Sequence, residues 1–162
     1  MPDKHIGSYL NHHLSASVAW LEAVQRVEDA EKGTPTARAL SELRAEGLAD
    51  QLMLREFMAQ LKVSERETEK ATAWLSEKLS RLMLPLKDPK EGSYNLLLIL
   101  EALSLGLEGR RALWVALAAA ARESVALQGP DYQILVRRAE EQRARMEQLR
   151  LETAKNALRP VQ

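Results

Sequence analysis

The sequence predicts an all-α protein, and three observations support that fold class. Apolar residues recur at intervals of three and four along most of the chain, which is the period of one helix face. No stretch of the sequence alternates apolar and polar residues over the length of a strand. Proline and glycine stand where the periodic segments end, as at Gly33 and in the stretch 85–93.

The first two helices are expected over about 8–31 and 35–61. Gly33 ends the first helix, because glycine readily adopts the left-handed conformation found at helix C-termini. Thr34 then caps the second helix, and Pro35 takes its first position, where no amide hydrogen is needed. The apolar positions of the second helix step alternately by three and four residues, a spacing that packs one helix against another.

Three further helices are expected over about 64–83, 93–123 and 131–158. Ser64 and Glu67 form a capping box, in which each side chain bonds the backbone amide of the other residue, so this helix follows the second one directly. We expect the first and second helices to form one antiparallel hairpin and the last two to form another. The middle helix and its loop then return the chain between the hairpins, within a single domain that spans 1–162.

Composition excludes several functional classes. The 23 Lys and Arg residues balance the 23 Asp and Glu residues, so the chain has no basic excess for nucleic acid or an anionic membrane. Cysteine is absent, which excludes disulfides, thiolate catalysis and cysteine-based zinc sites. The N-terminus lacks the pattern of a signal peptide, so a cytoplasmic location is expected. The apolar stretch 96–121 carries four charged residues, which argues against a membrane span. A helix that is apolar on all sides is instead expected to run through the middle of a soluble bundle.

The order and lengths of the predicted helices resemble the ferritin-like superfamily, in which a four-helix bundle joins two hairpins by one long crossover. The resemblance implies a di-metal site of iron or manganese, with candidate glutamates at Glu22, Glu46, Glu101 and Glu141. The Glu-x-x-His motifs of that superfamily are absent, since alanine stands three residues after both Glu46 and Glu141. Glu101 and Glu141 also differ in level along their hairpin by about 21 Å of helix rise. The metal hypothesis therefore needs an atypical ligand set, with the candidates Glu22, Glu46, Asp50 and Glu101.

A structural interpretation of the same polar residues is favoured. Buried carboxylates need polar partners, so these side chains are expected to form a polar core that fixes helix register. Its predicted members are Ser17, Asp50, Glu101, Glu108 and Gln142. Within this core we expect a hydrogen bond between Ser17 and Asp50, and Arg150 one turn from Glu101. Glu108 is expected near Gln148, and Arg111 near Arg145.

Histidine and aromatic residues give no strong case for catalysis. His5, His12 and His13 lie in the first thirteen residues, and adjacent His12 and His13 diverge by about 100° on a helix, which prevents chelation of one ion. These residues are expected at the surface or at an edge of the packing. The three tryptophans stand on different predicted helices and are expected to anchor the core, at Trp20, Trp74 and Trp114.

Three functions therefore remain open. The favoured hypothesis is a non-enzymatic association or scaffold protein that forms a homo-oligomer, with a dimer favoured, because its few helices carry long apolar faces. The first alternative is the atypical iron or manganese protein. The second is a binder of a small apolar ligand, which predicts a cavity beside Gly47 or Gly106. Gly47 would otherwise serve the close approach of Trp20.

Overall fold

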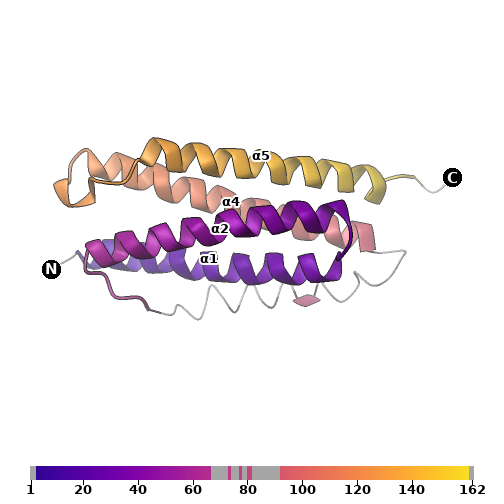
Figure 1. Cartoon of the computed structure of the whole chain (residues 1–162), viewed down its shortest axis with the longest axis horizontal. Coiled ribbons are helices and arrows are strands. Elements are labelled where there is room, and N and C mark those ends of the chain that lie inside the picture. Colours follow the sequence, from indigo (N-terminus) through magenta and orange to yellow (C-terminus); the bar gives the residue numbers. More distant parts are fainter. Residues whose placement is uncertain (1–2, 67–72, 74–76, 78–79, 82–91, 161–162) are drawn as a thin grey trace.

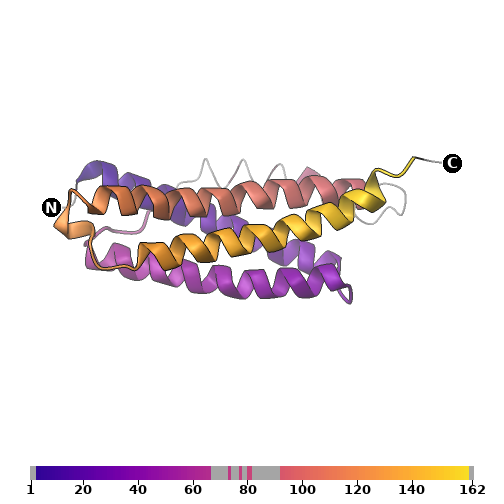
Figure 2. The same ribbon diagram turned by 90° about the horizontal axis from the view of Figure 1, so that it is seen from above.

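The structure, a computed structural model, describes residues 3–66, 73, 77, 80–81 and 92–160, and every regular element in those residues is helical. The elements are α1 (Lys4–Ala30), α2 (Pro35–Gln60), α4 (Gly92–Ala121), the short 3-10 helix η2 (Val125–Leu127) and α5 (Tyr132–Ala157). Figures 1 and 2 show α1 and α2 as one antiparallel hairpin and α4 and α5 as a second hairpin beside it. The predicted all-α class is therefore confirmed.

The first hairpin is defined by caps that the sequence displays. Gly33 has φ +87° and so takes the left-handed conformation expected at this helix end. The Thr34 hydroxyl accepts a hydrogen bond of 3.2 Å from the Ala37 amide, and Pro35 is the first residue of α2. The start of α1 was expected near residue 8 but lies at Lys4, because Asp3 accepts a hydrogen bond of 2.7 Å from the His5 amide and caps the helix.

The second hairpin turns through η2 and a sharp bend at Gly129, where φ is +132°. Asp131 then caps α5 by accepting a hydrogen bond of 3.2 Å from the Ile134 amide. Of the helix expected over 64–83, residues 73, 77, 80 and 81 are helical. Residues 64–66 are described and are not helical, so the predicted start of this helix directly after the second one is wrong. The remaining positions, including Glu67 of the capping box and Trp74, lie outside the described residues.

The core consists of two apolar clusters that follow one another along the bundle. One cluster contains Trp20, Val24, Leu40, Leu43, Ile99, Leu103, Leu107 and Met146, among others. The other contains Leu10, Leu14, Leu54, Phe57, Leu113, Trp114, Leu117 and Leu135, among others. On α2, α4 and α5, buried polar side chains stand in sequence between the two clusters, at Asp50, Arg110 and Gln142. We call these three residues the polar layer.

Helix α4 was expected to run through the middle of the bundle, and this prediction is only half right. Leu100, Leu103 and Leu107 are completely or almost completely buried, yet Leu105 is 73% exposed. Ala112 and Val115 are exposed as well. Helix α4 therefore carries more apolar side chains than the described helices cover. No helix in the described part of the chain is long and apolar enough to cross a membrane.

Candidate ligand-binding site

Trp20 on α1 lies between the backbones of two other helices. Its side chain is 3% exposed, and its indole Nε1 donates a hydrogen bond of 3.0 Å to the carbonyl oxygen of Leu103. A Cβ atom added to Gly106 on α4 would stand 2.5 Å from Cδ1 of the indole, and one added to Gly47 on α2 would stand 2.9 Å from Cζ3. Both glycines are thus needed for this packing. The expected approach of Trp20 to Gly47 is confirmed.

Arg110 lies against the face of the same indole. Its Cζ atom is 4.8 Å from the ring centroid of Trp20, a distance typical of a cation–π contact. Only 9% of the Arg110 side chain is exposed. Its Nη1 donates a hydrogen bond of 2.7 Å to Oε1 of Gln142 and lies 3.5 Å from Oδ2 of Asp50. Burial lowers the pKa of the Arg110 guanidinium, while the charge of Asp50 acts in the opposite direction.

Asp50 joins the two hairpins. Its side chain on α2 accepts a hydrogen bond of 2.9 Å from Nε2 of Gln142 on α5. Nη2 of Arg138, also on α5, lies 2.9 Å from Oδ1 of Asp50, although Oδ1 accepts no hydrogen bond. One turn away on α2, Glu46 accepts hydrogen bonds from Gln142 and from Arg145. These contacts hold α2 at a defined level against α5.

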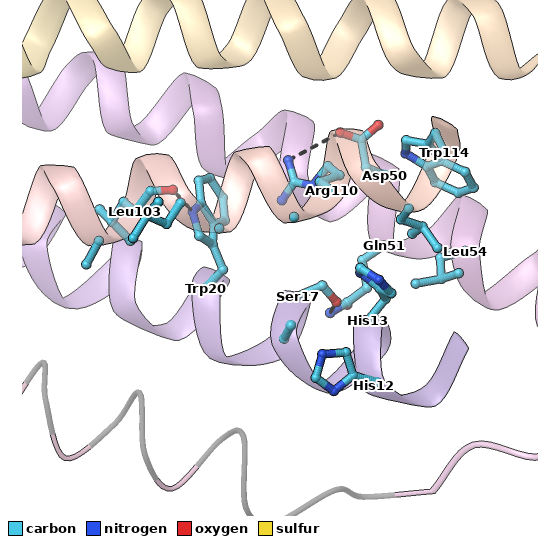
Figure 3. A pocket seen from close by; sticks show the side chains of 16 residues that line it. His12, His13, Ser17, Trp20, Asp50, Gln51, Leu54, Leu103, Arg110 and Trp114 are labelled. Atoms are coloured by element: carbon cyan, nitrogen blue, oxygen red, sulfur yellow. Dashed lines mark hydrogen bonds and ion pairs between the residues drawn. The ribbon is translucent and has the colours of Figure 1, made fainter. Parts of the chain in front are cut away.

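A cavity of about 260 Å³ opens beside this network, between α1, α2 and α4. Figure 3 shows it with Trp20 and Trp114 near its two ends and with Asp50 and Arg110 on a different side from His12. Its remaining walls are mostly small or apolar, and the lining residues include Ala16, Leu54, Ala102, Leu103, Leu105, Gly106, Gly109 and Leu113. The arrangement suits an apolar molecule that also meets a few polar groups.

His13 and Ser17 contribute polar atoms to the same cavity. Burial, and secondly the neighbouring charge of His12, lower the pKa of His13 from 6.5 to about 4. The His13 imidazole is therefore neutral at pH 7, with one nitrogen able to donate and the other to accept a hydrogen bond. Ser17 donates to the carbonyl oxygen of Leu14 at 2.7 Å and accepts from Nε2 of Gln51 at 3.0 Å.

A pH titration checks the environment of His13. We expect its imidazole signals in NMR spectra to titrate near pH 4. Because the unfolded chain binds this proton at a pKa of about 6.5, the stability of the fold falls as the pH drops from 6.5 towards 4. Substitution His13→Phe should remove that part of the pH dependence. A His13 titration near 6.5 would show that the ring is solvated.

Several sequence predictions about the polar core need correction. The predicted hydrogen bond between Ser17 and Asp50 is wrong, because Gln51 is the partner of Ser17 and Gln142 is the partner of Asp50. Both Asp50 and Gln142 are buried, as expected for members of the core. The prediction failed because it assumed that Asp50 faces α1, whereas its hydrogen-bond partner lies on α5.

The predictions for the carboxylates of α4 have mixed outcomes. Nη1 of Arg150 lies 3.2 Å from Oε1 of Glu101, so the proximity expected for this pair is present. Glu108 was expected near Gln148, but it pairs with Arg111 and with Arg143, the latter at 2.9 Å. Arg111 correspondingly lies near Glu140 rather than Arg145. The residues of α5 that lie beside Glu108 and Arg111 therefore come about one helical turn earlier in the chain than predicted.

The metal candidates do not fit a site for iron or manganese. Glu22 is exposed, and Glu101 is paired with Arg150. Glu46 and Asp50 do share a neighbourhood, but arginine side chains and Gln142 occupy their oxygens. Arginine cannot ligate a metal and repels one electrostatically. Within the described ranges, no group of three or more His, Asp or Glu residues is placed to hold an ion.

Sequence reasoning did not identify Arg110 or His13 as site residues. One signal was available for Arg110, because it is a charged residue in an otherwise apolar segment. It precedes Leu113 by three residues and Leu117 by seven, so it lies on the same buried face of the helix. No equivalent signal existed for His13, because its burial depends on how α1 meets α2 and α4. The comparisons with family models, curated proteins and solved structures found no match for this chain.

Proposed function

We propose that this protein is a non-catalytic binder of a small, mainly apolar molecule, held in the cavity between α1, α2 and α4. The observation that carries this proposal is the cavity itself, about 260 Å³ in volume and bordered by Trp20, Leu103, Leu113 and Trp114. An apolar cavity of about 150 Å³ inside a protein is enough to bind benzene, so this one has room for roughly ten non-hydrogen atoms.

The composition of the walls supports a ligand of this kind. Burial of apolar surface contributes about 25 cal/mol per Å², and most of the exposed wall belongs to aromatic, aliphatic and glycine residues. A few polar side chains also line the cavity, at His12, His13, Ser17, Asp50, Gln51 and Arg110. Such a distribution orients a bound molecule.

Filling the cavity tests the proposal. Ala102 lines the cavity on α4, and Ala102→Phe places a ring there. Ala112→Phe on the same helix is the matched control, because Ala112 is exposed and does not line the cavity. Titration calorimetry with indole is expected to show binding to the native protein and the control, and at least about tenfold weaker binding to Ala102→Phe. Equal affinity of all three proteins, or no binding at millimolar indole, would contradict the proposal.

We propose self-association as a second function, supported by the exposed apolar side of α4. Leu105 is 73% exposed and Val115 is 42% exposed, and Ala112 is exposed between them. Light scattering is expected to give the mass of a dimer, and Leu105→Glu is expected to give a monomer. Leu52→Glu changes a 58% exposed leucine on α2 and serves as the control that keeps the dimer. A native monomer at high micromolar concentration would exclude this role.

A ferritin-like arrangement of the bundle remains our proposal for its topology. The two antiparallel hairpins support it, and the segment between α2 and α4 would be the crossover. In this proposal the bundle keeps the superfamily's helix order but holds an apolar ligand site, and Arg110 and Gln142 occupy the polar centre.

A further inference from the structure

We propose that the ligand of this cavity is a small monocarboxylate with an apolar body, and that Arg110 binds its carboxylate. This inference rests on the proposed ligand-binding function and adds the chemical class of the ligand. It starts from Arg110, whose side chain is nine-tenths buried and lines the cavity.

The first argument concerns unused hydrogen-bond donors. Among the described residues, Arg110 donates a hydrogen bond only through Nη1, to Gln142. The Nε and Nη2 groups form the other edge of the guanidinium, with two N–H bonds that point the same way. That edge matches the two oxygens of a carboxylate, which arginine commonly binds in bidentate fashion. In Figure 3 the dashed ion pair joins Arg110 to Asp50, Trp20 lies on the other side of Arg110, and Ser17 and His13 lie across the pocket.

The second argument concerns charge. Among the residues that the structure describes, Arg110, Arg138 and Arg145 form ion pairs with two carboxylates, those of Asp50 and Glu46. The cluster thus has three cations and two anions. Arg138 and Arg145 are 34% and 39% exposed, so water solvates them, whereas Arg110 is 9% exposed. Asp50 is shared between Arg110 and Arg138. A ligand with one negative charge would balance the cluster at its most buried cation.

The third argument concerns the other end of the ligand. Beyond Arg110 the wall passes to Leu113, Trp114 and Leu54, which offer no charge. His13 is neutral at pH 7 because burial lowers its pKa to about 4, so it adds no second positive site. His12 lies at the same wall and is exposed. A carboxylate at Arg110 with an aryl or alkyl body towards Trp114 would therefore use both parts of the cavity.

Three probes of the same apolar body test the inference on the native protein. They are 3-phenylpropanoate, 3-phenylpropanamide and 3-phenylpropylamine, which share a phenyl ring on a three-carbon chain and end in an anionic, a neutral and a cationic group. Titration calorimetry at pH 7 is expected to show the carboxylate binding about ten- to a hundredfold more tightly than the amide, since a hydrogen bond to a charged partner is worth that ratio. The amine is expected to bind most weakly.

A substitution then assigns the preference to Arg110. In Arg110→Met the carboxylate is expected to bind no better than the amide, while binding of the amide is largely kept. If Arg110→Met fails to fold, Arg110→Lys keeps the charge but loses the bidentate edge, and the preference for the carboxylate is expected to fall at least threefold. Glu101→Gln is the control, because it alters a charge on α4 that does not line the cavity.

The outcomes separate the two proposals. If the amide binds as tightly as the carboxylate, or the amine binds best, the carboxylate inference is wrong and the apolar site stands. A carboxylate preference that persists in Arg110→Met and in Arg110→Lys would also overturn the inference, because another group would then provide it. If none of the three probes binds at millimolar concentration and indole does not bind either, the proposed function fails and the inference fails with it.

Discussion

Replacement of Asp50 by alanine is expected to destabilise the fold by about 3–5 kcal/mol, the range found when one partner of a buried ion pair is removed. Asp50 is 4% exposed and has Arg110, Arg138 and Gln142 around its carboxylate. Without that carboxylate Arg110 remains buried as an uncompensated cation. The Gln142 amide also loses one of its acceptors. Urea unfolding followed by circular dichroism measures the change.

Two comparisons isolate the cause of that loss. Glu101→Ala also removes a carboxylate paired with an arginine, but this pair is half exposed and its loss should cost less than about 1 kcal/mol. The double variant Asp50→Ala/Arg110→Met removes the uncompensated charge together with its partner and should recover part of the stability. If Asp50→Ala were as mild as Glu101→Ala, the polar layer would not hold the hairpins together.

Replacement of Gly106 by alanine is expected to destabilise the protein, although alanine is the better helix former. An added Cβ would lie 2.5 Å from Cδ1 of Trp20, well inside van der Waals contact. The indole has little room to move, because Gly47 lies on another side of it and its Nε1 is bonded to Leu103. Overpacking costs about 1–3 kcal/mol and the gain in helix propensity is about 1 kcal/mol, so we expect a net loss of up to about 2 kcal/mol.

Gly109→Ala provides the matched control one turn further along α4. A Cβ at Gly109 would meet nothing within 4 Å, so this variant should gain about 0.5–1 kcal/mol from helix propensity alone. The two substitutions are thus expected to have opposite signs in the same unfolding experiment. A stabilising Gly106→Ala would mean that the indole does not pack against the backbone of α4.

Local signals in the sequence were sufficient to predict the existence of α1, α2, α4 and α5. The ends of α2 could be predicted because Thr34, Pro35 and the spacing of apolar residues act within a few positions of one another. The start of α1 was placed four residues too late, because the prediction followed the apolar stripe and did not consider Asp3 as the N-cap. Such boundaries depend on a single hydrogen bond, which apolar periodicity does not report.

The site was harder to predict because its contacts join residues from separate helices. Gly47 indicated a close approach on α2, and its tryptophan partner could be proposed from the level along one hairpin. Contacts between the two hairpins, such as Asp50 with Gln142, depend on how the hairpins face each other. Hydrophobic periodicity shows which side of a helix is buried but not which helix covers it. For that reason Asp50 and Gln142 were identified as buried polar residues while the partner of Asp50 was not. Glu101 and Glu108, which were expected in the polar core, have side chains that are 45% and 39% exposed.

The position of the polar layer also has a consequence for how the molecule moves. The polar contacts of this layer bind α2 to α4 and α5, whereas α1 faces the cavity at the same level, so moving α1 outwards there breaks fewer apolar contacts than at either cluster. Local opening of the bundle is therefore expected to be easiest near mid-length, where the cavity lies, while both ends stay packed. Hydrogen exchange would then be fastest among the buried amides at mid-length, and a small molecule could enter there without unfolding either end.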